Sequence, residues 1–113
     1  MLVLNRFSVP TETQDGFRAQ AHAALAALAA TPGYLSGRLT RALEDPAGWV
    51  LVTEWESVGA YRRALGAFDV KVHATPLLAH SLDEPSAFET LASAEPGADV
   101  VITASDRAAE SWR

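Results

Sequence analysis

The chain contains no cysteine. This absence excludes disulfide bonds, thiolate metal sites and catalysis by a thiol nucleophile. Basic residues are also scarce, because 9 Lys and Arg stand against 14 Asp and Glu and give a net charge of −5. They form no cluster, so neither nucleic acid nor an anionic membrane surface is an expected partner.

Long hydrophobic runs are missing as well. No apolar segment approaches the roughly 20 residues that a membrane-spanning helix needs. The apolar start, residues 1–4, is too short for a signal peptide and lacks the positively charged residues of one. We therefore expect a cytoplasmic protein.

What remains is the composition of one small domain. The 113 residues can build a single, modest core. The hydrophobic fraction is 49% and the mean hydropathy is +0.05, which is high for a small monomer. We therefore expect some apolar surface to meet a partner subunit.

The first third of the chain predicts a strand followed by a helix. Residues 2–9 alternate, with Val3, Asn5 and Phe7 on one face. After Pro10, apolar residues recur at helical spacing in an alanine-rich segment that predicts a helix to about Ala30.

The rest of the chain predicts further strands around a second helix. Strands are expected at 34–44 and 49–56, joined by a turn at 45–48. Ser57 can cap a helix from 58 to 66 that continues raggedly to 73, and Pro76 breaks it. Tyr61, Leu65 and Phe68 have the helical spacing of core residues.

The last quarter of the chain carries weaker signals. Residues 87–91 predict a fourth strand, and 93–97 look like a linker. Residues 100–102 predict a fifth short strand or an arm that reaches a partner. We thus expect one domain at 1–92 and a C-terminal tail at 93–113.

The order β-α-β-β-α-β predicts an α+β, ferredoxin-like domain with helices on one face of an antiparallel sheet. Leu2 and Leu4 lie on the strand face opposite Asn5, and Val50 and Val52 lie opposite Trp55. Both sheet faces are therefore apolar, while two helices cover only one. We expect the other face to pack against a second copy in a homodimer.

Three short frames carry a resemblance to a known family. They are Asn-Arg-Phe at 5–7, Trp-Glu-Ser at 55–57 and His-Ala-Thr at 73–75, supported by Pro-Gly-Tyr at 32–34 and Ala-Tyr-Arg-Arg-Ala-Leu at 60–65. In this order they resemble the antibiotic biosynthesis monooxygenases, which are dimeric α+β barrels. The resemblance covers residues 2–91 and is closest to the anthrone oxygenases of aromatic polyketide pathways, which use neither metal nor flavin.

A second branch of the same family is also similar. The small heme-degrading oxygenases have an asparagine where Asn5 stands and a heme-ligating histidine where His73 stands. Their porphyrin-distorting tryptophan is replaced here by Ala64, and a second amide of the anthrone branch is replaced by Leu51. The resemblance therefore implies a protein without a cofactor, and heme binding stays an alternative.

Asn5 is a polar amide in an otherwise apolar strand face. One interpretation is a buried amide that bonds a loop backbone, as most buried amides have partners. The other is a hydrogen-bond donor to a substrate oxygen, which would stabilise the oxyanion of a deprotonated substrate.

Trp55 and His73 have the same two kinds of interpretation. Trp55 is either a core aromatic or an indole N–H that bonds a carbonyl or peroxide oxygen. His73 is either a structural or exposed histidine, or a proton acceptor with a suitable pKa, or a heme ligand. No pair of histidines has the spacing of a helical zinc site, and no metal site is expected.

Together these residues predict a small-molecule site. Catalytic roles are expected for Asn5, Trp55 and His73, and substrate-binding roles for Phe7, Leu51, Tyr61 and Phe68. The resemblance implies a monooxygenase that oxidises an anthrone- or hydroquinone-type aromatic substrate with O2 to a quinone. The alternatives are a heme-binding or heme-degrading oxygenase and a non-catalytic dimeric ligand-binding module.

Overall fold

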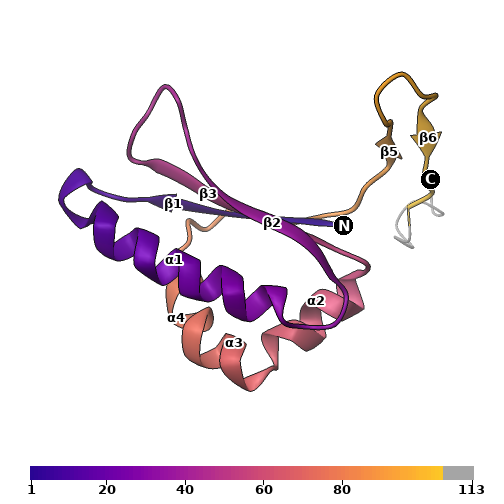
Figure 1. The fold of residues 1–113 in the computed structure, drawn as a ribbon. Helices are drawn as coiled ribbons and strands as arrows, with labels where there is room; N and C mark the ends of the chain where they lie inside the picture. Colours follow the sequence, from indigo (N-terminus) through magenta and orange to yellow (C-terminus); the bar gives the residue numbers. More distant parts are fainter. Residues whose placement is uncertain (106–113) are drawn as a thin grey trace.

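A computed structural model of the chain describes residues 1–105, so part of the predicted tail, residues 106–113, lies outside the described residues. The body consists, in chain order, of β1 (Leu2–Ser8), the 3-10 helix η1 (Thr11–Thr13), α1 (Gln14–Ala29), β2 (Tyr34–Arg41), β3 (Gly48–Trp55), α2 (Val58–Leu65), α3 (Phe68–His73), α4 (Thr75–Leu78) and β4 (Ala87–Phe88). A short hairpin of β5 (Ala92–Ser93) and β6 (Val101–Ile102) follows (Figure 1). The predicted α+β, ferredoxin-like order is confirmed.

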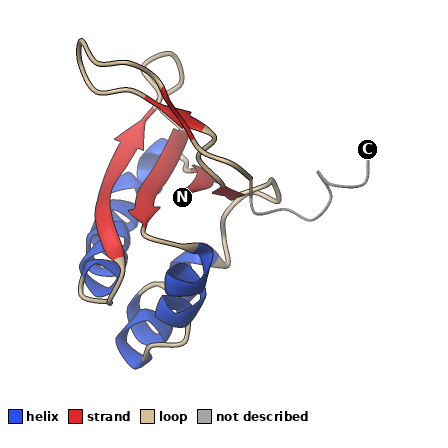
Figure 2. Ribbon diagram, turned by 90° about the vertical axis from the view of Figure 1, so that its right-hand side faces the viewer, coloured by secondary structure: helices blue, strands red, loops and turns tan. Residues whose placement is uncertain are grey.

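The sheet is antiparallel and has the strand order β2-β3-β1-β4. Asn5 of β1 lies opposite Leu51 of β3. On its other edge β1 is held by backbone hydrogen bonds of 2.7 Å from Leu4 N to Ser86 O and from Leu82 N to Arg6 O. The helices lie on one face of this sheet (Figures 1 and 2).

Several element ends differ from the sequence prediction. β2 ends at Arg41, short of residue 44, because the turn closes early through a bond of 2.8 Å from Ala42 N to Gly48 O. Within this turn Asp45 Oδ1 accepts from Ala47 N at 3.0 Å, as expected of an aspartate in this position. β4 is only two residues long, and β5 overlaps the start of the predicted linker at Ser93.

The second predicted helix is two helices. Ser57 caps α2 as predicted, and its Oγ accepts from Ala60 N at 3.0 Å. Gly66 ends α2, and α3 starts only at Phe68. The helical spacing that placed Phe68 in the core is therefore interrupted, and the Phe68 side chain is 78% exposed.

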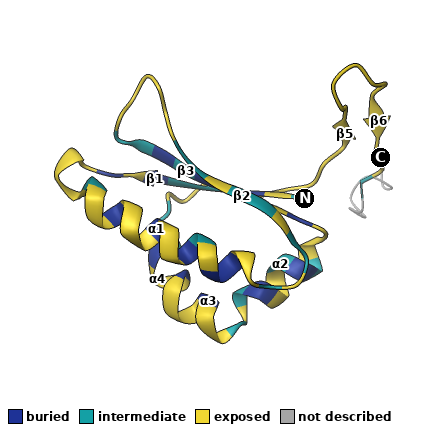
Figure 3. Ribbon diagram, viewed as in Figure 1, coloured by how far each residue is buried: buried dark blue, intermediate teal, exposed yellow. Residues whose placement is uncertain are grey.

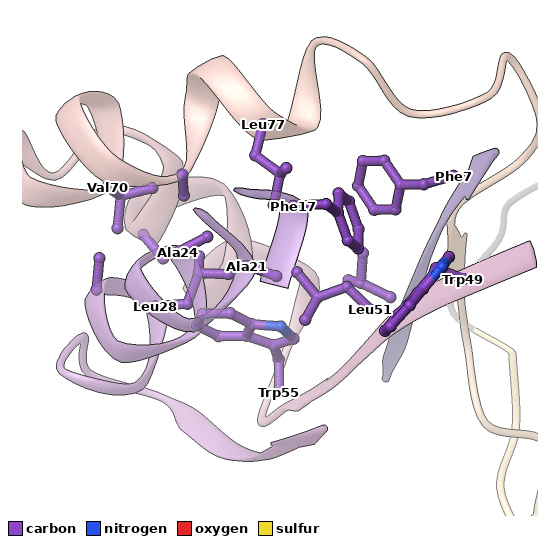
Figure 4. Packing of buried hydrophobic residues seen from close by; sticks show 14 of the residues in the cluster. Phe7, Phe17, Ala21, Ala24, Leu28, Trp49, Leu51, Trp55, Val70 and Leu77 are labelled. Carbon is purple, nitrogen blue, oxygen red and sulfur yellow. The ribbon is translucent and has the colours of Figure 1, made fainter. Parts of the chain in front are cut away.

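The core fills the space between the sheet and the helices (Figures 3 and 4). It holds two aromatic groups. In one, Phe17 contacts Phe7 and Trp49 with centroid distances of 5.1 and 5.3 Å. In the other, Trp55 contacts Tyr34 and Tyr61 at 5.3 and 5.4 Å. Both groups lie on the helix-covered side of β1 and β3.

The opposite face of the sheet, here named the bare face, carries partly exposed apolar side chains. They are Leu2, Leu4, Val50, Val52 and Phe88. The β5–β6 hairpin rises on this side of the sheet, away from the helices (Figure 1), and Ile102 at its end is 83% exposed. Among residues 1–105, no helix is long and apolar enough to cross a membrane.

Gly33 generates a prediction about stability. Its φ of +88° favours glycine, and a Cβ added there would lie 2.5 Å from Ala60 Cβ. We expect Gly33→Ala to lower the free energy of unfolding by at least about 2 kcal/mol, from backbone strain and the clash with α2. Urea unfolding measures this loss.

Gly97→Ala is the matched control. Gly97 also has a positive φ, of +74°, but its added Cβ meets no atom within 4 Å. Because Gly97 lies in the exposed hairpin, we expect the free energy of unfolding of the body to stay within about 0.5 kcal/mol of the parent value. Equal effects of the two substitutions would contradict a special role for the Gly33–Ala60 contact.

Candidate functional site

Asn5 lines an open cleft between β1 and the helices α2 and α4, here named the Asn5 cleft. Its volume is about 420 Å³, and its other lining residues are Tyr61, Leu65, Thr75, Leu78 and Ala79. The size falls within the range of small-molecule sites. Leu65, Leu78 and Ala79 form the aliphatic half of the wall, so the polar groups of the other three residues decide how a ligand is oriented.

The polar groups of the Asn5 cleft are free to bind a ligand. Within the described residues, the side chains of Asn5, Tyr61 and Thr75 make no hydrogen bond. Burial raises the pKa of Tyr61 above its usual value, so this hydroxyl stays protonated near neutral pH and can donate. The cleft therefore offers an amide and a phenol as donors to a ligand oxygen.

Trp55 does not line this cleft. Its side chain is fully buried, and Nε1 donates to Thr53 Oγ1 at 2.8 Å. The indole N–H is thus paired inside the protein, as a buried indole usually is. The Trp55 ring packs against Tyr61. Trp55 therefore affects the cleft by holding the Tyr61 side chain in position.

His73 lies at the exposed end of α3. It lines two surface grooves, one with Gln20, Ala23 and His80 and one with Ala23 and Asp69, and neither groove includes Asn5. The two residues that the heme hypothesis assigns to one ligand therefore line different clefts. Within residues 1–105, no three His, Asp or Glu side chains are grouped to hold a metal ion.

The four residues predicted to bind substrate are also spread over the molecule. Tyr61 lines the Asn5 cleft. Leu51 is buried in the core opposite Asn5, while Phe7 lines a separate cleft beside α1. Phe68 is exposed on α3. The structure thus brings together Asn5 and Tyr61, and leaves the other predicted residues outside their cleft.

Sequence reasoning missed the contribution of α4 to the wall. Thr75, Leu78 and Ala79 come from this single helical turn or directly follow it. The sequence predicts that Pro76 breaks a helix, yet it occupies the first turn of α4. Proline is well tolerated there because that N–H has no partner within the helix. A proline followed by two leucines was the available signal for this turn.

Comparison with known families identifies the chain. The antibiotic biosynthesis monooxygenase family matches residues 1–74. The chain belongs to this family. A comparison with curated protein sequences gives no significant match.

Solved structures agree with this membership. The chain is similar to SnoaB from Streptomyces nogalater, a cofactor-independent oxygenase, at 30% identity and a TM-score of 0.63, over 80% of this chain and 94% of SnoaB. A protein from Methanosarcina mazei matches at 20% identity and a TM-score of 0.63, over 76% of this chain and 84% of that one. A Mycobacterium tuberculosis protein matches at 20% identity and a TM-score of 0.61, over 95% and 96% of the two chains. The last two matches show the fold.

The Trp55–Thr53 pair generates a prediction about stability. Thr53→Val removes the acceptor and leaves a buried indole N–H without a partner, so we expect the free energy of unfolding to fall by about 1–3 kcal/mol. In the Trp55→Phe background the same change has no N–H to strand, and it should cost less than about 1 kcal/mol. Urea unfolding of the four proteins in this cycle gives the difference. Equal losses in both backgrounds would mean that this hydrogen bond contributes nothing to stability.

Proposed function

We propose that this family member is an oxygenase that needs neither metal nor flavin and oxidises an anthrone- or hydroquinone-type aromatic substrate to a quinone. The observation that carries the proposal is the unpaired Asn5 amide on the wall of a cleft of about 420 Å³ that is also lined by Leu65, Leu78 and Ala79. The similarity to SnoaB, a cofactor-independent oxygenase, supports the reaction class. A flat, mostly apolar ring system with one or two oxygens suits such a cleft.

Binding in the Asn5 cleft would prepare the substrate for loss of a proton. The Asn5 amide donates to the carbonyl oxygen of an anthrone, on which negative charge develops when the opposite ring carbon is deprotonated. The Tyr61 hydroxyl, kept protonated by burial, is a second donor close to the same ligand. Fixed donors in a partly dry site stabilise such an anion more than water does.

The proton acceptor in this scheme is water at the open mouth of the cleft. His73 lies outside the cleft, so it takes no part in the proposed proton transfer. This placement changes the role that the sequence suggested for the imidazole. The contribution of the protein is then to hold the ring system, exclude most of the water and stabilise one oxyanion.

The oxidation itself needs only the anion and dioxygen. The carbanion gives one electron to O2, and the resulting pair combines to form a carbon–oxygen bond. Protonation gives a hydroperoxide, which loses the remaining hydrogen on that carbon as a proton. The O–O bond then breaks and water leaves. An anthrone and O2 thus give an anthraquinone and one water, with all atoms and electrons balanced.

Asn5→Ala tests the oxyanion role. We expect kcat for oxygen uptake with the anthrone dithranol to fall about 100- to 1000-fold, the loss typical of removing one oxyanion donor. An oxygen electrode measures the rate. Thr11→Ala, which removes an exposed hydroxyl of η1 far from the cleft, should leave the rate unchanged. A full rate in Asn5→Ala, or no oxygen uptake by the parent protein, would refute the proposed function.

We also propose that the protein works as a homodimer joined through the bare face. The partly exposed row of Leu2, Leu4, Val50, Val52 and Phe88 supports this arrangement. The β5–β6 hairpin rises on the same side (Figure 1). A two-stranded hairpin this short is not stable alone in water, so we assign it as an arm that packs on the second copy.

Val52→Asp tests the dimer. Val52 lies in the middle of the bare face, between Leu4 and Arg38 on the neighbouring strands. A carboxylate among these apolar side chains loses its hydration in the dimer, and a cross-strand pair with Arg38 restores only part of that loss, so dimerisation should weaken by at least about 10-fold. Sedimentation velocity over a concentration series measures this change. Thr11→Asp adds the same charge on η1 and should leave the dissociation constant unchanged; a monomeric parent would exclude the interface.

A further inference from the structure

A second cleft lies on the helix-covered side of the sheet, beside the first turns of α1. Its volume is about 350 Å³. The residues that line it include Phe7, Val9, Gly16, Phe17, Leu77 and His80. We name it the α1 cleft. It shares no lining residue with the Asn5 cleft, and the proposed oxygenase reaction does not use it.

The floor of the α1 cleft is apolar and aromatic. Phe7 and Phe17 are buried, with ring centroids 5.1 Å apart and an interplanar angle of 59°. Val9 and Leu77, also buried, extend this floor. The parts of these rings that line the cleft give a ligand an apolar, aromatic contact surface.

The rim of the α1 cleft is polar. Gln20 and His80 are exposed at the rim, and within the described residues their side chains make no hydrogen bond. None of the residues lining the cleft is acidic. An imidazole offers ring nitrogens for hydrogen bonds, and the glutamine amide offers both a donor and an acceptor.

Gly16 is a lining residue of this cleft that can be changed without disturbing the packing. It lies in the first turn of α1, where glycine weakens a helix by up to about 1 kcal/mol relative to alanine. Its φ is not positive, and an added Cβ would meet no atom within 4 Å. Neither the backbone nor the packing of the described residues requires glycine here. Because Gly16 lines the cleft, a long side chain at this position has room to enter it.

We propose that the α1 cleft is a second binding site, for a small bicyclic phenol. The ring system lies on Phe7 and Phe17, and the phenolic oxygen reaches His80 and Gln20 at the rim. A cavity of about 150 Å³ is enough for benzene, so a cleft of about 350 Å³ accommodates two fused rings and a hydroxyl. A phenol both donates and accepts one hydrogen bond, which matches an imidazole and an amide.

This proposal is independent of the oxygenase reaction. The α1 cleft is on the helix-covered side, so a dimer through the bare face leaves it open. Its occupancy is measured by binding alone, without O2 or turnover. If the protein proved not to be an oxygenase, 2-naphthol binding at the α1 cleft would still be expected. If the α1 cleft bound no phenol, the proposed oxygenase reaction would be unaffected.

2-Naphthol is the probe, and two-dimensional NMR of the ¹⁵N-labelled full chain is the measurement. We expect saturable shifts of the backbone amides of Gly16, Phe17 and Phe7. Gly16→Leu places a large side chain in the cleft and should weaken 2-naphthol binding at least about 10-fold. Leucine has a higher helix propensity than glycine, so the substitution should not destabilise α1. Gly16→Ala is the matched control, because one methyl group occupies little of the cleft, and it should bind within about 3-fold of the parent.

Two further variants complete the test. His80→Leu removes the imidazole but keeps the bulk of the side chain, and it should weaken the binding of 2-naphthol about 3- to 10-fold. Asn5→Ala should leave the shifts at Gly16 and Phe17 unchanged. Equal binding by Gly16→Leu and the parent would overturn the proposal. So would shifts confined to the Asn5 cleft, or no saturable shift of Gly16 and Phe17.

Discussion

The packing of the Trp55 indole between Tyr34 and Tyr61 sets the geometry on which the Asn5 cleft depends. The indole is fully buried at the end of β3, and its N–H is paired with Thr53. Two residues later Ser57 caps α2, so this helix starts from a fixed point. Tyr61 is then held against the indole and forms the cleft wall that faces Asn5. The buried Trp55–Thr53 hydrogen bond thus helps to position the cleft wall, although neither residue lines the cleft.

Much of the fold could be predicted from the sequence, because alternation and helical spacing reflect burial directly. The alternation of β1 placed Asn5 on the helix-covered face, and the pairing of β1 with β3 agrees. The break between α2 and α3 was missed, since the spacing of Tyr61, Leu65 and Phe68 continues across Gly66. Spacing alone does not show where a helix axis changes direction. The strand predicted at 100–102 contains β6, whereas its two-residue partner β5 is too short to leave a periodic signal.

The candidate site was harder to predict, because a cleft depends on how elements pack. Asn5 and Tyr61 come together since β1 and α2 are packed in one layered domain. His73 has the proper chemistry for a base, but α3 turns its side chain to the surface. Trp55 has an N–H that could bind a ligand, yet Thr53, two residues away on the same strand face, takes it. Residue type therefore indicated possible chemistry, and packing decided which residues meet.

The strand order leaves β2 at one edge of the sheet, with its outer backbone groups unpaired among the described residues. Such an edge invites another strand to add to the sheet, which is a route to open-ended aggregation. Arg38 lies in the middle of β2, and a bulge interrupts the strand at Leu35. In an antiparallel pairing of two such edges centred on residue 38, the guanidinium groups of both copies would face each other and repel. Self-association along this edge is thereby disfavoured, and growth of the sheet into a fibre is opposed by charge.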